Sequence, residues 1–220
     1  EGTGMAKTVT AAEMKERERA ANEAGLLYIQ MMENAGRAAY AELKRRVPAL
    51  RRLLIVAGKG NNGGDGFVMA RVAAKEGVQV RVLLAEGEPK TADAKTNLAR
   101  LAETAAEIVR DTEQAAFGAD AVVDALYGTG FHGELRPDGA AACALMGRER
   151  ERGAFVLALD LPSGVSADSG EVAEGAVQAD ATVTFDCTKP LHFAKASKPL
   201  CGALVCADIG IGKTLGEHET

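Results

Sequence analysis

The sequence has no tryptophan, few aromatic residues and no excess of positive charge. Aromatic residues make up 4% of its 220 positions, so small aliphatic side chains must fill much of the interior, which favours close packing of helices on a sheet. The net charge is −5, and this argues against the basic surface that nucleic-acid binding needs. No apolar run approaches the ~20 residues that cross a bilayer. We therefore expect neither nucleic acid nor a membrane as a partner.

The four cysteines contain no C-x-x-C pair. Such pairs are typical of zinc sites and of redox-active disulfides, so neither is predicted. Cys201 and Cys206 would lie on opposite faces of a strand if that segment is extended. Without a secretory signal pattern, we expect buried thiols in a reducing compartment and hence a cytoplasmic location.

Helix-like and strand-like segments alternate along the chain. Helical spacing of apolar residues occurs in 10–24, 26–47, 65–77, 91–106 and 138–152. Thr10, followed by Glu13 three residues later, predicts a capping box for the first of these helices. Apolar, β-like segments are 52–58, 78–84, 107–110, 119–126, 154–164, 179–185 and 202–211. This alternation predicts one α/β domain with a mostly parallel sheet, helices on both faces and two helices before the first strand.

Polar or glycine-rich stretches follow four of the predicted strands. They are GKGNNGGDG (58–66), YGTGFHGELR (127–136), DLPSG (160–164) and DCTKP (186–190). In an open parallel sheet, ligands bind beyond the carboxyl ends of the strands. We therefore expect the four stretches to converge on one rim and to form the binding site there.

The first stretch, 58–66, contains the G-x-G-x-x-G spacing of a dinucleotide-binding loop. Glu86 follows at about the 20-residue distance at which such folds place an acid for the ribose. Asn61, Asn62 and Asp65 do not suit that loop, because a carboxylate beside a pyrophosphate needs a cation or a sugar hydroxyl as its partner. Two interpretations stay open: a nucleotide site with a cation, or a turn whose amides and acid only cap the next helix.

The second stretch, 127–136, has three glycines and a threonine hydroxyl at Thr129, the features of a phosphate-binding loop. Asp124 lies just before it, inside the predicted strand. This acid either caps the next turn or, opposite Asn62, is an oxygen ligand for a cation. Ser163 of the third stretch adds a hydroxyl, and a donor set made only of oxygen suits a hard cation rather than zinc.

The third and fourth stretches carry the candidate proton-transfer groups. Asp160 ends a buried apolar strand, where an unpartnered carboxylate is costly, so it is either a functional acid or a partner of the following turn. Lys189 is equally a ligand for phosphate, a proton-transfer group or an ordinary surface lysine. Asp186 accompanies it, and we interpret His132 and His192 as structural histidines near the site.

These motifs together resemble the NAD(P)H-hydrate epimerase family. The resemblance rests on GKGNNGGDGFVMAR, DALYGTGFHGELR, LDLPSGVSADSGEV, ADATVTF, ADIGI and the helical MMENAG, and it extends from about residue 10 to 211. It implies a Rossmann-like three-layer α/β/α sandwich and a homodimer. It also implies interconversion of the R and S hydrates of NADH and NADPH (NADHX and NADPHX), a damage-repair reaction, with a bound potassium ion.

The resemblance also implies roles for individual residues. The hydrate would contact Asn61, Asn62, Gly63, Gly64, Asp65, Gly128, Thr129, Gly130, Phe131, His132, Gly133, Glu134 and Asp160. Potassium would be held by Asn62, Asp124 and Ser163. The hydrated carbon is a hemiaminal, so its inversion needs proton transfer, and we expect Asp160 to supply it with Lys189 as a helper. An iminium route and a ring-opening route both stay open.

Two other functions and the chain ends complete the expectations. An NAD-dependent oxidoreductase and a nucleotide-binding scaffold without catalysis remain as alternatives. Residues 1–9 are expected to be a vector-derived remnant and an N-terminal segment, 10–213 the domain, and 214–220 a tail. Some family members join this domain to a hydrate dehydratase, so the chain is either a protein that stands alone or one module of a longer one.

Overall fold

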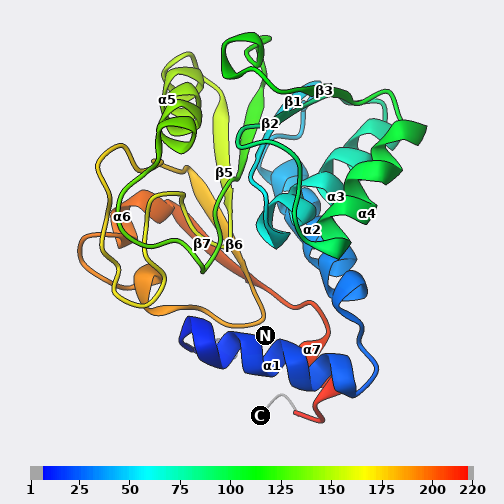
Figure 1. Ribbon diagram of the computed structural model, residues 1–220, viewed down its shortest axis with the longest axis vertical. Coiled ribbons are helices and arrows are strands. Elements are labelled where there is room, and N and C mark those ends of the chain that lie inside the picture. Colours follow the sequence, from blue (N-terminus) through cyan, green and yellow to red (C-terminus); the bar gives the residue numbers. More distant parts are fainter. Residues whose placement is uncertain (1–6, 218–220) are drawn as a thin grey trace.

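A parallel β-sheet forms the centre of the molecule (Figure 1). The structure is a computed structural model that describes residues 7–217, so the predicted remnant at the start of the chain lies outside the described residues. The strands are β1 (Arg52–Ala57), β2 (Gln79–Leu84), β3 (Glu107–Val109), β4 (Ala121–Ala125), β5 (Phe155–Leu159), β6 (Ala181–Phe185) and β7 (Ala203–Ala207). Their order in the sheet is β3-β2-β1-β4-β5-β6-β7, and each neighbouring pair is parallel. The predicted α/β class is confirmed.

Helices cover both faces of this sheet. They are α1 (Ala11–Glu23), α2 (Tyr28–Arg46), α3 (Asn61–Lys75), α4 (Ala92–Arg100), α5 (Pro137–Glu151), α6 (Lys198–Cys201) and α7 (Ile211–Thr214), with 3₁₀ turns η1 (Leu101–Glu103), η2 (Thr112–Gln114) and η3 (Pro190–His192). Helices α2, α3 and α4 lie on one face and α5 on the other (Figure 1). The result is the predicted three-layer sandwich. No helix in residues 7–217 combines the length and apolar composition needed to cross a membrane.

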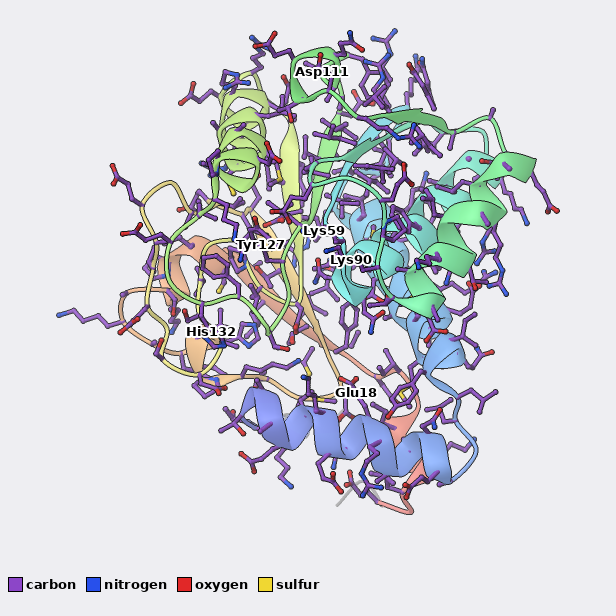
Figure 2. All side chains as sticks on the ribbon, viewed as in Figure 1. Glu18, Lys59, Lys90, Asp111, Tyr127 and His132 are labelled. Atoms are coloured by element: carbon purple, nitrogen blue, oxygen red, sulfur yellow. The ribbon has the colours of Figure 1, made fainter. Side chains whose placement is uncertain are left out.

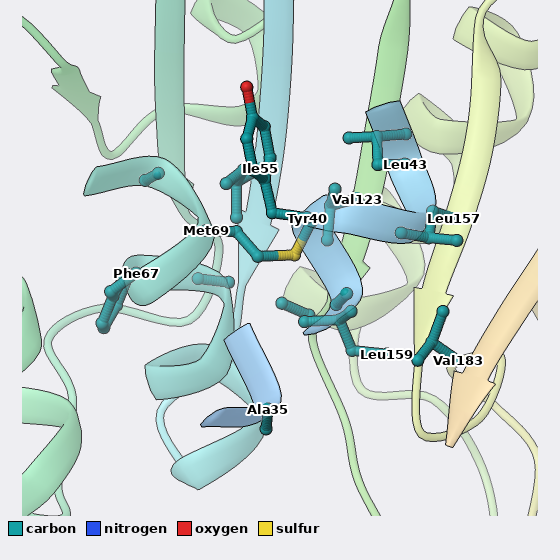
Figure 3. Packing of buried hydrophobic residues seen from close by; sticks show 14 of the residues in the cluster. Ala35, Tyr40, Leu43, Ile55, Phe67, Met69, Val123, Leu157, Leu159 and Val183 are labelled. Atoms are coloured by element: carbon teal, nitrogen blue, oxygen red, sulfur yellow. The ribbon is translucent and has the colours of Figure 1, made fainter. Parts of the chain in front are cut away.

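Successive side chains along each strand point to opposite faces of the sheet, so the hydrophobic core has two parts. Ile55, Val123 and Leu157 point to the side of α2 and α3, where Tyr40 lies beside Ile55 and Val123 (Figure 3). The intervening strand residues point to the side of α5. Because both faces are covered, the central strands β1 and β5 are almost entirely apolar, which explains their continuous hydrophobic runs in the sequence.

Helix α1 is attached to the ends of the last strands rather than to the sheet face. The predicted capping box at its start is present. Arg17 Nε donates to Asp186 Oδ2 at 2.7 Å, and the Val9 amide donates to the Thr188 carbonyl at 2.9 Å. Val9 is buried, so the packed domain includes residues before position 10, where the sequence places its start. These contacts hold α1 beside the carboxyl ends of β5 and β6.

One predicted strand end is wrong: β7 ends at Ala207, because a polar turn follows it. β5 ends at Leu159, directly before the polar stretch 160–164 that the sequence places after this strand. Cys201 lies in α6 and not in a strand, so the argument about opposite strand faces does not apply to it. All four cysteines are free thiols. The most consequential difference is that α3 begins at Asn61, so the NNGGDG segment is helix rather than loop.

Gly58 permits the close approach of two chain segments beside this helix. Its amide donates to the Ala125 carbonyl at 2.9 Å, directly after the end of β1. A Cβ at Gly58 would lie 1.9 Å from the carbonyl oxygen of Leu126, which is main chain and has little freedom to move. A residue without a side chain is therefore required where the β1 and β4 ends meet.

We expect Gly58→Ala to lower the free energy of unfolding by about 1–3 kcal/mol, because the added methyl group must displace backbone. The control is Gly147→Ala in α5, where nothing lies within 4 Å of an added Cβ and alanine favours the helix. Urea denaturation measures both changes. Equal stability of the two variants would contradict the proposed close approach.

Candidate functional site

The four stretches that follow β1, β4, β5 and β6 meet at one cleft of about 560 Å³. Each stretch contributes to the lining of this cleft, for example through Asn61, Thr129, Asp160 and Lys189. Helix α1 closes the cleft from the other side, and Figure 2 shows Glu18 on this helix, with Lys59, Tyr127 and His132 on the side of the strand ends. The parallel sheet therefore gathers segments that are distant in the sequence, as expected for the carboxyl ends of its strands.

Most of the predicted site residues line this cleft. Those in its lining are Asn61, Asn62, Asp65, Gly128, Thr129, Gly130, Phe131, His132, Glu134, Asp160 and Lys189. Five others are outside the lining: Gly63, Gly64, Gly133, Asp124 and Ser163. A Cβ at Gly63 would lie 2.4 Å from the Gly58 carbonyl oxygen, and one at Gly64 would lie 2.5 Å from the Met32 methyl group. These two glycines allow α3 to pack closely, and their contact with substrate stays a prediction.

Asp160 is held in an unusual backbone conformation at the end of β5. Its φ is +71°, a left-handed value that residues other than glycine seldom adopt. Its Oδ1 accepts hydrogen bonds from Thr184 Oγ1 and Lys189 Nζ, both at 2.8 Å. Such strained conformations persist where the surroundings impose them, and they are concentrated at functional sites. The carboxyl is therefore fixed in orientation at the wall of the cleft.

Charge pairing decides the protonation state of Asp160. Burial opposes ionisation, but the Lys189 ammonium and the hydrogen bonds from Lys189 and Thr184 outweigh it and lower the pKa of the Asp160 carboxyl. Lys189 is 2% exposed, and its ammonium also donates to Thr184 Oγ1 at 2.7 Å and to the Phe185 carbonyl at 3.2 Å. All three ammonium protons thus have acceptors. Asp160 is an ionised carboxylate at neutral pH and can accept a proton.

His192 supports this pair from behind. Its Nδ1 accepts from the Lys189 amide at 2.9 Å, so Nε2 carries the proton and donates to the Asp160 carbonyl at 2.8 Å. Burial lowers the pKa of this imidazole, and it is buried away from the cleft lining. The interpretation of His192 as structural agrees with these contacts. His132 is exposed at the cleft edge.

Asp124 and Ser163 form a buried polar centre beneath the cleft. Ser163 Oγ donates to Asp124 Oδ1 at 2.6 Å, and the Ser163 amide donates to Oδ2 at 2.7 Å. Burial is the largest influence on the Asp124 carboxyl and raises its pKa to about 6, although these hydrogen bonds act in the opposite direction. Asn62 Nδ2 donates to the Leu159 carbonyl at 2.9 Å, but its Oδ1 is buried without a hydrogen-bond partner among the described residues.

Two further carboxyls lie in the same cleft as Asp160. Burial, followed by the charges of Asp160 and Glu18, raises the pKa of Asp65 well above its ordinary value. Burial and the nearby Asp160 also raise the pKa of Glu18. Only Lys189 makes an ion pair with any of these three acids within residues 7–217. The cleft therefore favours the ionised form of Asp160 and the protonated form of Asp65.

The sequence patterns missed the residues that α1 contributes to the cleft lining. Met14, Lys15 and Glu18 line the cleft, but nothing in their helical pattern distinguishes them from an ordinary surface helix. Glu86 also lines it and accepts from Tyr127 Oη at 2.8 Å. The spacing of about 20 residues between the glycine-rich stretch and Glu86 had indicated this residue in the sequence.

Tyr127 and Phe131 form an aromatic stack within the second stretch, with ring centroids 5.1 Å apart. Both rings line the cleft. Asp186, in contrast, has an ion pair with Arg17 and does not line the cleft. Of the two charged candidates in the fourth stretch, only Lys189 reaches the site.

We expect His192→Leu to lower the free energy of unfolding by about 1–3 kcal/mol at pH 7.5, because the Lys189 amide loses its acceptor and the Asp160 carbonyl its donor. Exposed His132, replaced in the same way, is the matched control. The pKa of His192 is lower in the folded protein than in the unfolded chain. The stabilisation that neutral His192 gives to the folded state is therefore present above the unfolded-state pKa, and it is lost as the pH falls through the folded-state pKa. Urea titrations at pH 7.5 and pH 5 should therefore show a smaller loss on acidification in His192→Leu than in the original protein. The reverse order would count against this role.

Comparison with known proteins places these features in a family. A family model described as "YjeF-related protein N-terminus" matches residues 28–191. The NAD(P)H-hydrate epimerase of Pirellula staleyi is 40% identical over 207 residues, which cover 88% of this chain and 88% of that protein. The bifunctional NAD(P)H-hydrate repair enzyme Nnr of Coxiella burnetii is 36% identical over 203 residues, covering 92% of this chain and 41% of that protein.

A second bifunctional repair enzyme Nnr, from Moorella thermoacetica, is 38% identical over 220 residues and is also covered over 41% of its length. The chain thus spans about two fifths of these bifunctional relatives. The crystal structure of yeast ynu0 (YNL200c) matches with a TM-score of 0.76 and 21% identity, over 87% of this chain and 86% of that one. At this identity the structural likeness supports the fold alone.

Proposed function

The chain belongs to the family of YjeF-related protein N-termini, as its motifs predict, and we propose that it is an NAD(P)H-hydrate epimerase, an isomerase that interconverts the R and S forms of NADHX and NADPHX. The single observation that carries this proposal is Asp160, a carboxylate held ionised by Lys189 at the wall of a cleft large enough for a nucleotide. Members of one family share a fold more securely than a reaction, so the site must support the chemistry independently.

Epimerisation at the hydrated carbon requires a base, a bound phosphate-containing substrate and no redox partner. Asp160 supplies the base, and its fixed orientation keeps it in place during the reaction. The first amides of α3, at Asn61 and Asn62 in the cleft lining, and the glycine-rich stretch 128–130 offer hydrogen-bond donors to the phosphates. Tyr127 and Phe131 present aromatic surface to a ring of the substrate.

Two other functions are disfavoured by particular residues. Asp65, in the second turn of α3, places a carboxyl close to where a dehydrogenase of this topology binds pyrophosphate. A binding scaffold without catalysis does not require the strained φ of Asp160 or a buried lysine paired with it. Both features have an energetic cost that a proton-transfer role explains.

A potassium ion fits the residues beneath the cleft. Asn62 Oδ1 is a buried acceptor without a donor, and Asp124 is a buried carboxyl whose ionisation needs a positive partner. Asn62, Asp124 and Ser163 present oxygen atoms, and the described residues contain no group of three or more His, Cys, Asp or Glu suited to a metal ion. This donor set suits a weakly charged hard cation. When bound, potassium would supply positive charge near the substrate phosphates.

We propose two further properties on less direct grounds. A homodimer is expected from the family resemblance, and sedimentation velocity would measure it. A cytoplasmic location agrees with four free cysteines, three of them buried.

We predict that Asp160→Asn lowers the rate of epimerisation by about 10²–10⁴-fold, because an amide cannot accept the proton. The assay starts from the R hydrate and couples formation of the S hydrate to an S-specific dehydratase. Absorbance at 340 nm without that coupling enzyme reports any hydride transfer. Unchanged turnover in the variant would remove Asp160 from the mechanism, and sustained oxidation of NADH would favour a dehydrogenase.

A test of the cation compares potassium chloride with tetramethylammonium chloride at equal ionic strength. We expect potassium to raise the midpoint of thermal unfolding and to strengthen binding of NADPHX, since a ligand that binds only the folded state stabilises it. Asn62→Leu should abolish both effects, whereas Asn97→Leu, which alters an amide outside the cleft lining, should keep the potassium dependence. The same midpoint and affinity in both salts would contradict a potassium site.

A further inference from the structure

A hydrogen bond brings the start of α3 against the end of β5. Asn62 Nδ2 donates to the carbonyl of Leu159, the residue before Asp160, at 2.9 Å. Asp65 lies three residues after Asn62 in α3, and residues at this spacing share one face of a helix. Both Asp65 and Asp160 line the cleft. The fold therefore places two carboxyls from different elements in one cleft.

These two carboxyls have different surroundings. Asp160 Oδ1 accepts from Lys189 and Thr184, whereas the Asp65 carboxyl has no hydrogen bond or ion pair with any residue from 7 to 217. The charged groups that influence Asp65 are Asp160 after β5, Lys189 after β6 and Glu18 in α1. Two of these three are acids, so the surroundings of Asp65 favour its neutral form, while those of Asp160 favour the anion. Carboxyls whose environments separate their protonation states are suited to act as an acid and a base.

We propose that Asp65 is a second catalytic residue of this site, the general acid that works with Asp160 as the base. The inference rests on the proposed epimerase function and deepens it. Asp65 donates its proton to the hydroxyl on the hydrated carbon, the carbon–oxygen bond breaks, and the hydroxyl leaves as water. The lone pair of the ring nitrogen forms the C=N bond of an iminium ion.

The second half of the reaction restores the hydrate with inverted configuration. Water adds to the other face of the iminium carbon, and Asp160 takes the proton that this water releases. Asp65 is then ionised and Asp160 protonated, and proton exchange through solvent returns both to their starting states. The reverse reaction uses Asp160 as the acid and Asp65 as the base, so one pair of carboxyls serves both directions.

The test compares Asp65→Asn with the original protein over a range of pH. We expect kcat to fall by about 10²–10⁴-fold, the range for loss of a general acid, with KM changed by less than threefold. In the original protein, kcat should fall at high pH as Asp65 loses its proton, and this alkaline limb should disappear in the variant. Asp65→Glu, which keeps an acid, should restore part of kcat and the alkaline limb. Asp138→Asn, a change to an exposed carboxyl of α5 outside the cleft lining, should leave kcat within threefold.

A third variant tests the environment of Asp65. Glu18→Gln removes an acid that raises the pKa of Asp65, so the alkaline limb should move to lower pH. An Asp65→Asn variant that keeps kcat, or that changes KM alone, overturns the inference. So does an alkaline limb that persists in Asp65→Asn. An original protein without any epimerase activity refutes the proposed function instead, which keeps the two failures distinct.

Discussion

The buried ion pair between Lys189 and Asp160 is the interaction on which the site depends. A lysine that is 2% exposed needs acceptors for its three protons, and the end of β6 supplies two of them through Thr184 and Phe185. Asp160 supplies the third and in return stays ionised. Because the pair joins the ends of β5 and β6, any shift between these strands would disturb the protonation of Asp160. In the proposed acid–base chemistry the sheet would therefore fix the charge of the base.

Secondary structure could be predicted from the sequence wherever a hydrophobic period was unbroken. The weak strand at 107–110 and the capping box at Thr10 are both present, since each rests on local chemistry. The start of α3 was missed because glycines and amides at 61–66 are poor helix formers. Tertiary contacts compensate there: the small residues let α3 approach the neighbouring backbone and α2. Helix propensity, which depends on the local sequence, cannot predict such tertiary contacts.

The site could be predicted to the extent that it lies at strand ends. Asp160 and Thr129 follow buried strands, and the parallel topology brings such positions together. Glu18 and Lys15 come from a helix that is held at the cleft by contacts between residues far apart in the chain, among them the ion pair between Arg17 and Asp186. An ion pair between residues so far apart produces no periodic pattern in the sequence. Asp186 also follows a strand, but it forms an ion pair with Arg17 and does not line the cleft.

Neighbouring carboxyls in one fold acquire different states because their partners differ. Asp160 has an ammonium group, Asp124 has hydrogen-bond donors but no cation among the described residues, and Asp65 has neither. Their pKa values are correspondingly lowered, raised to about 6 and raised well above the ordinary range. A potassium ion beside Asp124 would allow that acid to ionise without making the cleft more acidic. The arrangement keeps an ionised and a protonated carboxyl together at neutral pH, which the proposed reaction needs if the hydroxyl of the hemiaminal carbon is to leave from one face and return to the other.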